Sequence, residues 1–368
     1  MAAHLLAFAV SVFVLAIVLW DAFETVILPR TVTGRLRLTR LYFGVGWRIW
    51  TWIGRTICPD ARRERFLATF GPLSLLALIA GWAIGLVIGF GGLQWALGSH
   101  VRPLTTRTAI LDDLYMSGST FFTLGLGDVQ PVGWIARSIT VAEAGTGFAF
   151  LAIVIAYFPV LYQSFSRRET QLTLLDTWAG SPPTAVEALR RLATANELPA
   201  LQPFLQEWER WCSDILESHI SYPAIAFFRS QHQRQSWVAA LAAILDLSAL
   251  VEVGIDGVPP WQAHLTFAMA RHAAVDLTQV LRTEPDLNAD RLPPGELEAL
   301  RRQLERVGLV LKRSPEADAQ LIHLRRSYEP YICGLARALM MPLPPWAHDP
   351  ALRDNWQTDP KGLGDAHL

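Results

Sequence analysis

The chain has 368 residues, of which 51% are hydrophobic and 18% are charged, and its formal net charge is −1 at pH 7. Soluble domains average about 25% charged residues, so this composition indicates one membrane-embedded part and one soluble part. The balanced charge and the lack of long basic tracts argue against nucleic acid as a partner. Three widely separated cysteines indicate neither a disulfide framework nor a zinc site: Cys58, Cys212 and Cys333.

Three apolar stretches in the first half predict membrane-spanning helices. Phe66–Gly98 and Trp134–Gln163 exceed the about 20 residues that a spanning helix needs. Leu5–Trp20 is shorter, but the helical pattern continues to Leu28, where the following proline ends it. We interpret this first stretch as a retained anchor, because it has neither a basic start nor a small-residue cleavage site. Asp21 near its end is expected to snorkel or to pair with arginines, or alternatively to have a functional role.

The charges between the spans predict their orientation. The loop Pro29–Arg65 contains nine arginines and two acidic residues, and short basic loops stay in the cytoplasm. The N-terminus then lies outside and the C-terminal half lies in the cytoplasm, and Arg167 and Arg168 past the last span agree with this orientation. Tryptophans and arginines in Leu41–Ile57 predict a helix on the membrane surface. We therefore expect a multi-pass protein of the plasma membrane.

Between the two long spans, the sequence changes from a helical pattern to alternating glycines. Ala109–Phe122 is typical of a short helix, with Thr108 as its N-cap. The segment Thr123-Leu-Gly-Leu-Gly-Asp128 cannot easily continue that helix, because its glycines permit backbone angles that other residues avoid. Such a strand can turn successive carbonyl oxygens the same way and replace the water shell of a cation. Irregular backbone at membrane depth is tolerated where it is buried or lines a water-filled path, so this segment predicts an ion path.

The segment Thr120-Phe-Phe-Thr-Leu-Gly-Leu-Gly-Asp128 resembles the signature of the potassium-channel superfamily, T-x-x-T-V-G-Y-G-D. The resemblance covers the two long spans and the loop between them, a two-transmembrane pore module to which this chain adds an N-terminal span. It implies that Asp128 lies just outside a selectivity filter that Gly127 closes at its mouth. It also implies that the permeant K⁺ is bound by backbone carbonyls, with no cofactor, at Thr123, Leu124, Gly125 and Leu126. One chain carries one pore loop, so the resemblance implies a homotetramer.

This sequence departs from the signature in three places. Leu126 stands where tyrosine is usual, so the hydroxyl that ties the filter to the pore helix is missing. The second pore loops of eukaryotic two-pore-domain potassium channels are similar in this respect, since some of them also carry leucine there. Phe122 and Ser119 stand where threonine and glutamate occur in family members. We therefore expect a potassium-selective filter that is held less rigidly.

The inner span Trp134–Gln163 contains the expected gating residues. Glu143 is its only charge besides one arginine at the outer end, and it either braces the pore helix, which we favour, or faces the cavity as a cation site. Gly145 and Gly147 serve close packing or bending. Pro159 cannot donate its backbone hydrogen bond, so we expect a kink near the cytoplasmic end that suits a gate.

The second half alternates helical stretches with proline and glycine breaks, which predicts an all-helical cytoplasmic domain. Its last helices are expected at Pro294–Leu311 and Glu316–Met340, the latter bent or broken at Pro330. A Rossmann-type nucleotide-binding ring would need G-x-G-x-x-G after a strand, and this motif does not occur after residue 168. The sequence contains no recognisable catalytic motif, so we expect no enzyme, while a regulatory ligand of this domain stays open.

These patterns together predict an all-α membrane protein with a pore module of outer helix, re-entrant pore helix with filter, and inner helix. The predicted function is a potassium-selective channel among membrane lipids. The alternatives are a weakly selective cation channel and a non-conducting, membrane-tethered helical binding module. The expected parts, by residue number, are an N-terminal transmembrane helix (1–28), a basic loop with an interfacial helix (29–65), the pore module (66–166), a cytoplasmic helical domain (167–345) and a disordered tail (346–368).

Overall fold

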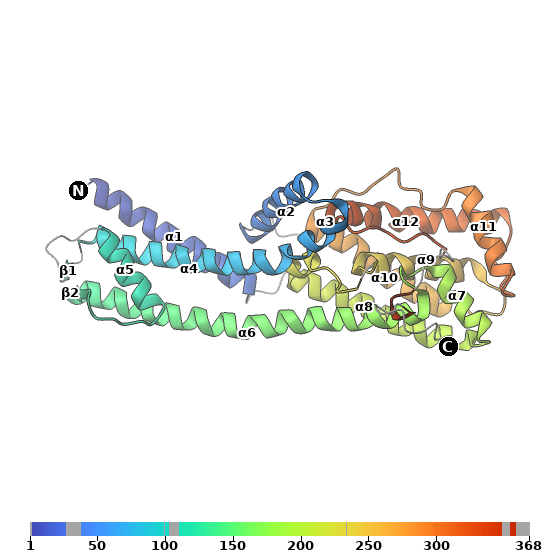
Figure 1. The fold of residues 1–368 in the computed structure, drawn as a ribbon, viewed down its shortest axis with the longest axis horizontal. Coiled ribbons are helices and arrows are strands. Elements are labelled where there is room, and N and C mark those ends of the chain that lie inside the picture. Colours follow the sequence, from blue (N-terminus) through green and yellow to red (C-terminus); the bar gives the residue numbers. More distant parts are fainter. Residues whose placement is uncertain are drawn as a thin grey trace. The chain divides into compact units, whose positions relative to one another are not determined.

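The computed structural model describes residues 2–26, 38–98, 100–102, 110–232, 234–347 and 354–357. The chain divides into two compact units, one ending at Tyr162 and one beginning at Gln163. Both units are built almost entirely from helices, and Figure 1 shows their order along the chain. The expected all-α membrane protein is confirmed. The expected basic-loop residues 29–37 and the N-cap Thr108 lie outside the described residues.

The first unit contains the predicted spans and the loop between them. A small antiparallel pair of strands, β1 (His100–Arg102) and β2 (Gln130–Val132), brackets the segment between the outer and inner helices. Its helices are α1 (Ala2–Val26), α2 (Leu38–Ile57), α3 (Asp60–Ala68), α4 (Phe70–Ala96), α5 (Ile110–Phe121) and the first part of α6 (Trp134–Ala179).

Small residues bring α1 and α4 close together. A Cβ added at Gly89 in α4 would lie 2.7 Å from the side chain of Leu15, and one at Gly92 would lie 2.5 Å from the Ser11 hydroxyl. Small residues at such contacts are the usual means by which membrane helices approach one another, since lipid supplies little hydrophobic drive. The helix α1 therefore packs directly against the outer helix α4.

Asp21 joins three helices by hydrogen bonds. Its carboxylate accepts from the Trp82 indole in α4 at 2.9 Å and from the Thr39 hydroxyl in α2 at 2.9 Å. Asp21 is buried, so these donors replace the water that the carboxylate loses. The described partners of Asp21 are thus an indole and a threonine, whereas the expected partners were arginines.

The second unit is a helical domain arranged around α9 (Trp237–Gly254). Four helices of the described chain are long and apolar enough to cross a membrane, and α9 is one of them, but 89% of its apolar window is buried inside the protein. Since α7, α8, α10 and α12 all pack against it, α9 is the central core helix of this domain. The other elements are η1 (Leu198–Ala200), η2 (Pro223–Phe227), α7 (Ala185–Thr194), α8 (Leu201–Ser221), α10 (Trp261–Leu281), α11 (Pro294–Glu305) and α12 (Pro315–Leu339).

Three helix boundaries differ from the sequence-based expectation. The helix α6 does not end at Gln163 but continues to Ala179, with Pro159 inside it. The helix α12 likewise passes through Pro330 without a break, and the Pro330 carbonyl accepts the Asp286 N–H at 2.8 Å. The helix α11 stops at Glu305, since Gly308 follows with a φ of 79° and ends the helical path.

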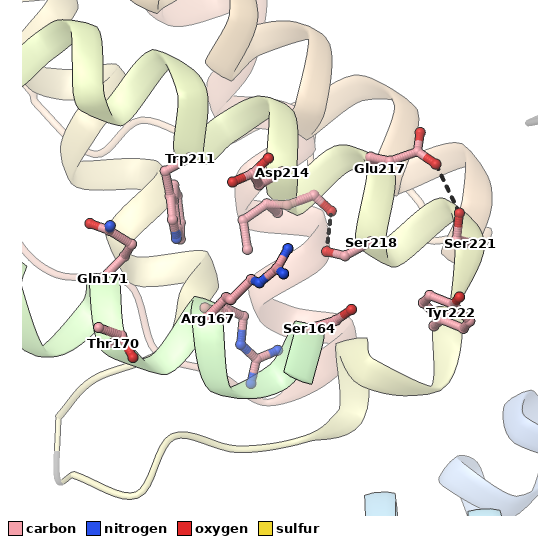
Figure 2. A pocket seen from close by; sticks show the side chains of 12 residues that line it. Ser164, Arg167, Thr170, Gln171, Trp211, Asp214, Glu217, Ser218, Ser221 and Tyr222 are labelled. Atoms are coloured by element: carbon pink, nitrogen blue, oxygen red, sulfur yellow. Dashed lines mark hydrogen bonds between the residues drawn. The ribbon is translucent and has the colours of Figure 1, made fainter. Parts of the chain in front are cut away.

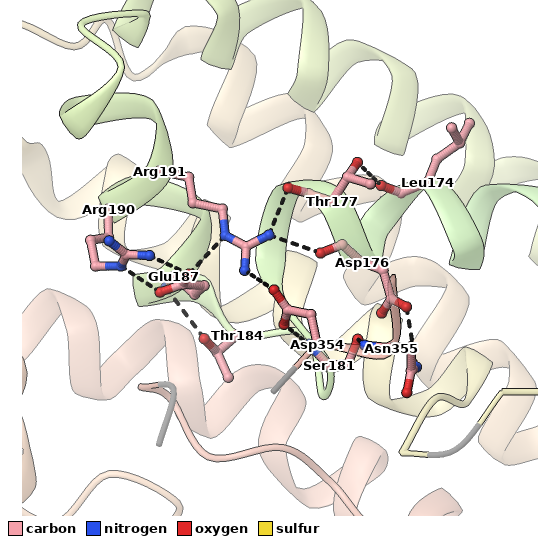
Figure 3. A network of polar contacts seen from close by, with 10 residues as sticks. All are labelled: Leu174, Asp176, Thr177, Ser181, Thr184, Glu187, Arg190, Arg191, Asp354 and Asn355. Carbon is pink, nitrogen blue, oxygen red and sulfur yellow. Dashed lines mark hydrogen bonds and ion pairs between the residues drawn. The ribbon is translucent and has the colours of Figure 1, made fainter. Parts of the chain in front are cut away.

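The expectation of a disordered tail from residue 346 is wrong for the described part of that segment. Trp346 is only 2% exposed, and the short helix η3 (Asn355–Gln357) lies next to Asp354. The Asp354 carboxylate accepts from the Arg191 guanidinium and from the Ser181 N–H (Figure 3). An ion pair and a buried indole hold this segment in place. Neither contact can be predicted from the local composition of the sequence.

Candidate functional site

The pore loop begins where α5 ends. The Thr123 N–H donates to the Thr120 carbonyl at 3.0 Å, and the Leu124 N–H donates to the Ser119 carbonyl at 2.8 Å. The Gly125 N–H also points to the Ser119 carbonyl, at 3.4 Å. The last carbonyls of the short helix therefore hold the first residues of the loop, so the loop starts from a fixed position.

The backbone of the loop alternates in the sign of φ. Thr123, Gly125 and Gly127 have φ values of 58°, 57° and 77°, while Leu124 and Leu126 between them do not have positive φ. Glycine adopts positive φ without strain, whereas threonine does so rarely, so the backbone of Thr123 is strained. Residues of alternating hand align successive N–H groups on one side of the chain and carbonyls on the other. The loop can thus present a row of carbonyl oxygens.

The outer end of the loop is tied down by side chains. Tyr115, in α5, interacts with the Asp128 carboxylate, and this carboxylate accepts the Val129 N–H at 3.1 Å. The Gln130 amide donates to the Gly127 carbonyl at 3.1 Å. The contact between Tyr115 and Asp128 was not identified from the sequence. The signal for it was a tyrosine in the short helix before the loop, ahead of the aspartate that follows the loop. This link supplies a connection to the pore helix that Leu126 cannot make.

The apolar side chains of the loop have no cover within the chain. Leu124 and Leu126 are each 63% exposed, and Phe122 is 59% exposed. Large exposed apolar side chains that lie together mark a surface for association. The described part of the chain leaves these three side chains uncovered.

Glu143 lies between the inner and pore helices. It is 0% exposed, and it is hydrogen-bonded to the hydroxyl of Ser117 in α5. The same Ser117 oxygen lies 2.8 Å from the Val87 carbonyl in α4. A second hydrogen bond connects α4 to α6, because the Gln94 amide donates to the Ala136 carbonyl at 3.0 Å. Glu143 thus contacts the pore helix, an arrangement that fits bracing better than a cation site.

The two glycines of α6 differ in their surroundings. A Cβ at Gly147 would lie 2.3 Å from the carbonyl oxygen of Phe121, the last residue of α5, whereas one at Gly145 would meet no described atom within 4 Å. Gly147 therefore allows the inner helix to touch the end of the pore helix. Pro159 lies farther along α6 and is exposed.

The described residues contain no cluster of three or more His, Cys, Asp or Glu that would hold a metal ion through side chains.

Comparison with known proteins gives one family and several relatives. The sequence model of a family described as "Ion channel" matches residues 75–163. The chain is 24% identical over 250 residues to "Uncharacterized membrane protein YdjJ" of Bacillus subtilis (strain 168), an alignment that covers 67% of this chain and 71% of that protein.

Two shorter alignments agree with this. The chain is 34% identical over 93 residues to "Protein LctB" of Geobacillus stearothermophilus and 30% identical over 93 residues to "Protein LctB" of Bacillus caldotenax. Each of these alignments covers 23% of this chain and 69% of the relative. No solved structure matches the chain. The family match extends from α4 through the pore loop into α6, the region that contains the geometry described above.

Proposed function

Because this chain belongs to the ion channel family, we propose that it is a potassium-selective channel whose filter is Thr123–Gly127. The observation that carries the proposal is the alternation of positive φ at Thr123, Gly125 and Gly127. A row of backbone oxygens can replace the water shell of a dehydrated potassium ion, and this row needs no side-chain chemistry. Asp128 lies just beyond the row, where a carboxylate favours cations.

The proposed channel is a homotetramer. One chain supplies one loop, and a closed ring of identical subunits places four such loops around one axis. The exposed Leu124, Leu126 and Phe122 support this assembly, since neighbouring copies would cover them. We place the tetramer in the plasma membrane among lipids, with the N-terminus outside and the helical domain in the cytoplasm.

The inner helix α6 is the proposed moving part. Glu143 braces the pore helix, Gly147 allows close contact with it, and Pro159 supplies the position at which α6 bends to open or close the path. Gly145, which faces open space in the single chain, is proposed to line the path next to them. The bend at Pro159 follows from its missing N–H, which leaves one helical carbonyl without a partner.

A weakly selective cation channel is the second candidate, and Leu126 is the observation that favours it. The leucine removes one hydroxyl anchor, so the carbonyl row has fewer constraints on its diameter. The link between Tyr115 and Asp128 acts against this loosening. Selectivity decides between the two candidates.

The test is a reversal potential of the purified full-length protein in a planar bilayer, with potassium on one side and sodium on the other. A reversal near the potassium equilibrium potential supports the proposal. A reversal near zero with clear current supports the weakly selective channel. If no current appears even when Pro159→Ala and Pro159→Gly variants are used to change the bend, the proposal of a conducting pore is wrong and the tethered binding module remains.

Two glycine substitutions supply the control for that experiment. Gly125→Ala places a Cβ at a φ of 57°, where a left-handed backbone costs about 1–2 kcal/mol, and so disturbs the carbonyl row. Gly81→Ala adds the same atom in the helical backbone of α4 with no described neighbour. The current is expected to be lost in the first variant and retained in the second.

A further inference from the structure

The helical domain contains a cavity of about 490 Å³ between the end of α6 and α8. Figure 2 shows Arg167, Thr170 and Gln171 on α6 facing Trp211, Asp214 and Ser218 on α8. Its volume lies within the about 300–1,000 Å³ that small-molecule sites occupy. All of its lining residues belong to the unit that begins at Gln163.

Three polar groups in this cavity have no partner among the described residues. Trp211 is 3% exposed, and its indole N–H makes no hydrogen bond. Arg167 and Asp214 are exposed at the mouth of the cavity, and neither has a hydrogen bond or ion pair with a described residue. A buried donor without an acceptor loses its water and gains nothing in return, so the indole indicates an acceptor that the chain itself does not supply.

The other charged groups of the cavity are already satisfied. Arg168 pairs with Glu169 at 3.0 Å and donates to the Ile225 and Phe228 carbonyls at 3.0 and 2.7 Å. Glu217 accepts from the Ser221 hydroxyl at 3.0 Å. Besides these contacts, the lining offers one buried N–H donor without an acceptor and two exposed side chains of opposite charge, Arg167 and Asp214.

The geometry points to a small zwitterion of the amino-acid type as the ligand of this cavity, and we infer that it regulates the proposed channel. A carboxylate would accept from the Trp211 N–H and the Arg167 guanidinium, which favours the bidentate geometry of carboxylates. An ammonium group would pair with Asp214. Arg167 and Asp214 line one cavity without forming an ion pair with each other, so a molecule with both charges satisfies both residues. A simple anion would leave Asp214 unpaired and be repelled by it.

The regulatory part of this inference rests on the proposed function and on the continuity of α6. Arg167, Thr170 and Gln171 lie on the same helix as Glu143 and Gly147. A ligand that connects α6 to α8 would favour one position of the α6 end over another. A shift in the position of the α6 end alters ion conduction only if the channel proposal holds.

Binding is tested on purified full-length protein by isothermal titration calorimetry and by thermal unfolding. The probes are the twenty common L-amino acids one at a time, with acetate, inorganic phosphate and ethylammonium as probes that carry one kind of charge. At least one amino acid is expected to bind and to raise the unfolding midpoint, while the single-charge probes do not. Arg167→Gln, Asp214→Asn and Trp211→Phe are each expected to weaken that binding about tenfold or more, the loss of one hydrogen bond to a charged group.

The matched control is Arg210→Gln, which removes the same charge from an exposed position of α8 outside the cavity lining. It is expected to leave the affinity unchanged. The inference is overturned if no amino acid binds, or if acetate or phosphate binds as tightly and Asp214→Asn has no effect. A control variant that weakens binding as much as Arg167→Gln overturns it as well.

Potassium flux into proteoliposomes separates this inference from the proposed function. The amino acid that binds is expected to change the flux of the wild-type protein and not that of Arg167→Gln. Binding without any change in a measurable flux overturns the regulatory part. Binding by a protein that conducts nothing contradicts the proposed function and leaves the ligand site standing, because calorimetry does not depend on conduction.

Discussion

Glu143 in the inner helix α6 is hydrogen-bonded to Ser117 in the pore helix α5, in a layer that solvent does not reach. Ser117 lies two residues before Ser119, whose carbonyl holds the first N–H groups of the pore loop. The Ser117 oxygen also lies 2.8 Å from the Val87 carbonyl of α4. The carboxyl group of Glu143 thus connects the inner helix to the helix that leads into the pore loop.

Glu143→Ala is predicted to loosen the pore helix, and Glu143→Gln is predicted to preserve it. Alanine leaves Ser117 with one partner fewer and opens a cavity, which together cost about 2–4 kcal/mol. Glutamine keeps the volume and offers an amide to Ser117. The measurements are the heat stability of the purified protein and the potassium-to-sodium permeability ratio. Equal loss in both variants would show that the charge, and not the contact, matters at this position.

Gly147→Ala and Gly145→Ala are predicted to differ, although the residues are two positions apart in one helix. The new methyl group at position 147 would lie 2.3 Å from the Phe121 carbonyl, so α5 and α6 must separate. The methyl group at position 145 meets no described atom within 4 Å, and alanine favours a helix over glycine by about 1 kcal/mol. The thermal unfolding midpoint should fall for the first variant and stay or rise for the second. A larger loss at position 145 would contradict the packing described here.

The features that could be predicted from the sequence are those that depend on residues close together along the chain. The spans and the helix before the loop follow from apolar runs and helical patterning, so Phe66–Gly98 and Ala109–Phe122 correspond closely to α4 and α5. The alternating glycines at 125 and 127 predicted an irregular backbone for a local reason, because only glycine adopts positive φ freely.

The contacts that sequence reasoning missed join residues far apart along the chain. The bond between Asp21 and Trp82 spans 61 residues, and the one between Arg191 and Asp354 spans 163. The position of Asp21 in an apolar span indicated that it needs a partner but not which one, and nothing around Asp354 in the sequence indicated burial. The continuation of α6 beyond Gln163 to Ala179 was not predicted, because the apolar run that marks the span ends there while the helix does not.

Asp354→Ala is predicted to destabilise the helical domain. Asp354 receives hydrogen bonds from Arg191, and Arg191 also donates to the Asp176 and Thr177 carbonyls near the end of α6 (Figure 3). Removal of the carboxylate leaves the arginine and the Ser181 N–H without this acceptor, which costs about 1–3 kcal/mol. The thermal unfolding midpoint of the domain checks this. Glu207→Ala, at an exposed position of α8, is the control and should leave the midpoint unchanged, whereas an equal drop would refute the contact's role.

The stability of the helical domain is predicted to fall when the pH is lowered from 7.5 to 5.5, because of His219. Burial, and next to it the Arg168 guanidinium, lower the pKa of this histidine from 6.5 to about 3. Its Nδ1 bonds the Ile215 carbonyl at 2.9 Å, and its ring packs against Trp237. The unfolded chain takes up a proton as the pH falls through 6.5, while the folded domain does not. Lower pH therefore stabilises the unfolded state relative to the folded one.

The sign and the size of this effect are both testable. The free energy of unfolding should be unaffected by His219 above about pH 7.5 and should decrease by about 1 kcal/mol at pH 5.5, since one unit of pKa corresponds to 1.36 kcal/mol. His219→Gln removes the titrating group and should reduce this part of the pH dependence, although it lowers stability at every pH by disturbing the core. The control is His272→Gln on the surface, where the neighbouring Asp276 is the described partner. Chemical unfolding of both variants at pH 7.5 and 5.5, followed by tryptophan fluorescence, measures the difference. An unchanged pH dependence in His219→Gln would mean that His219 does not stay neutral in the folded domain.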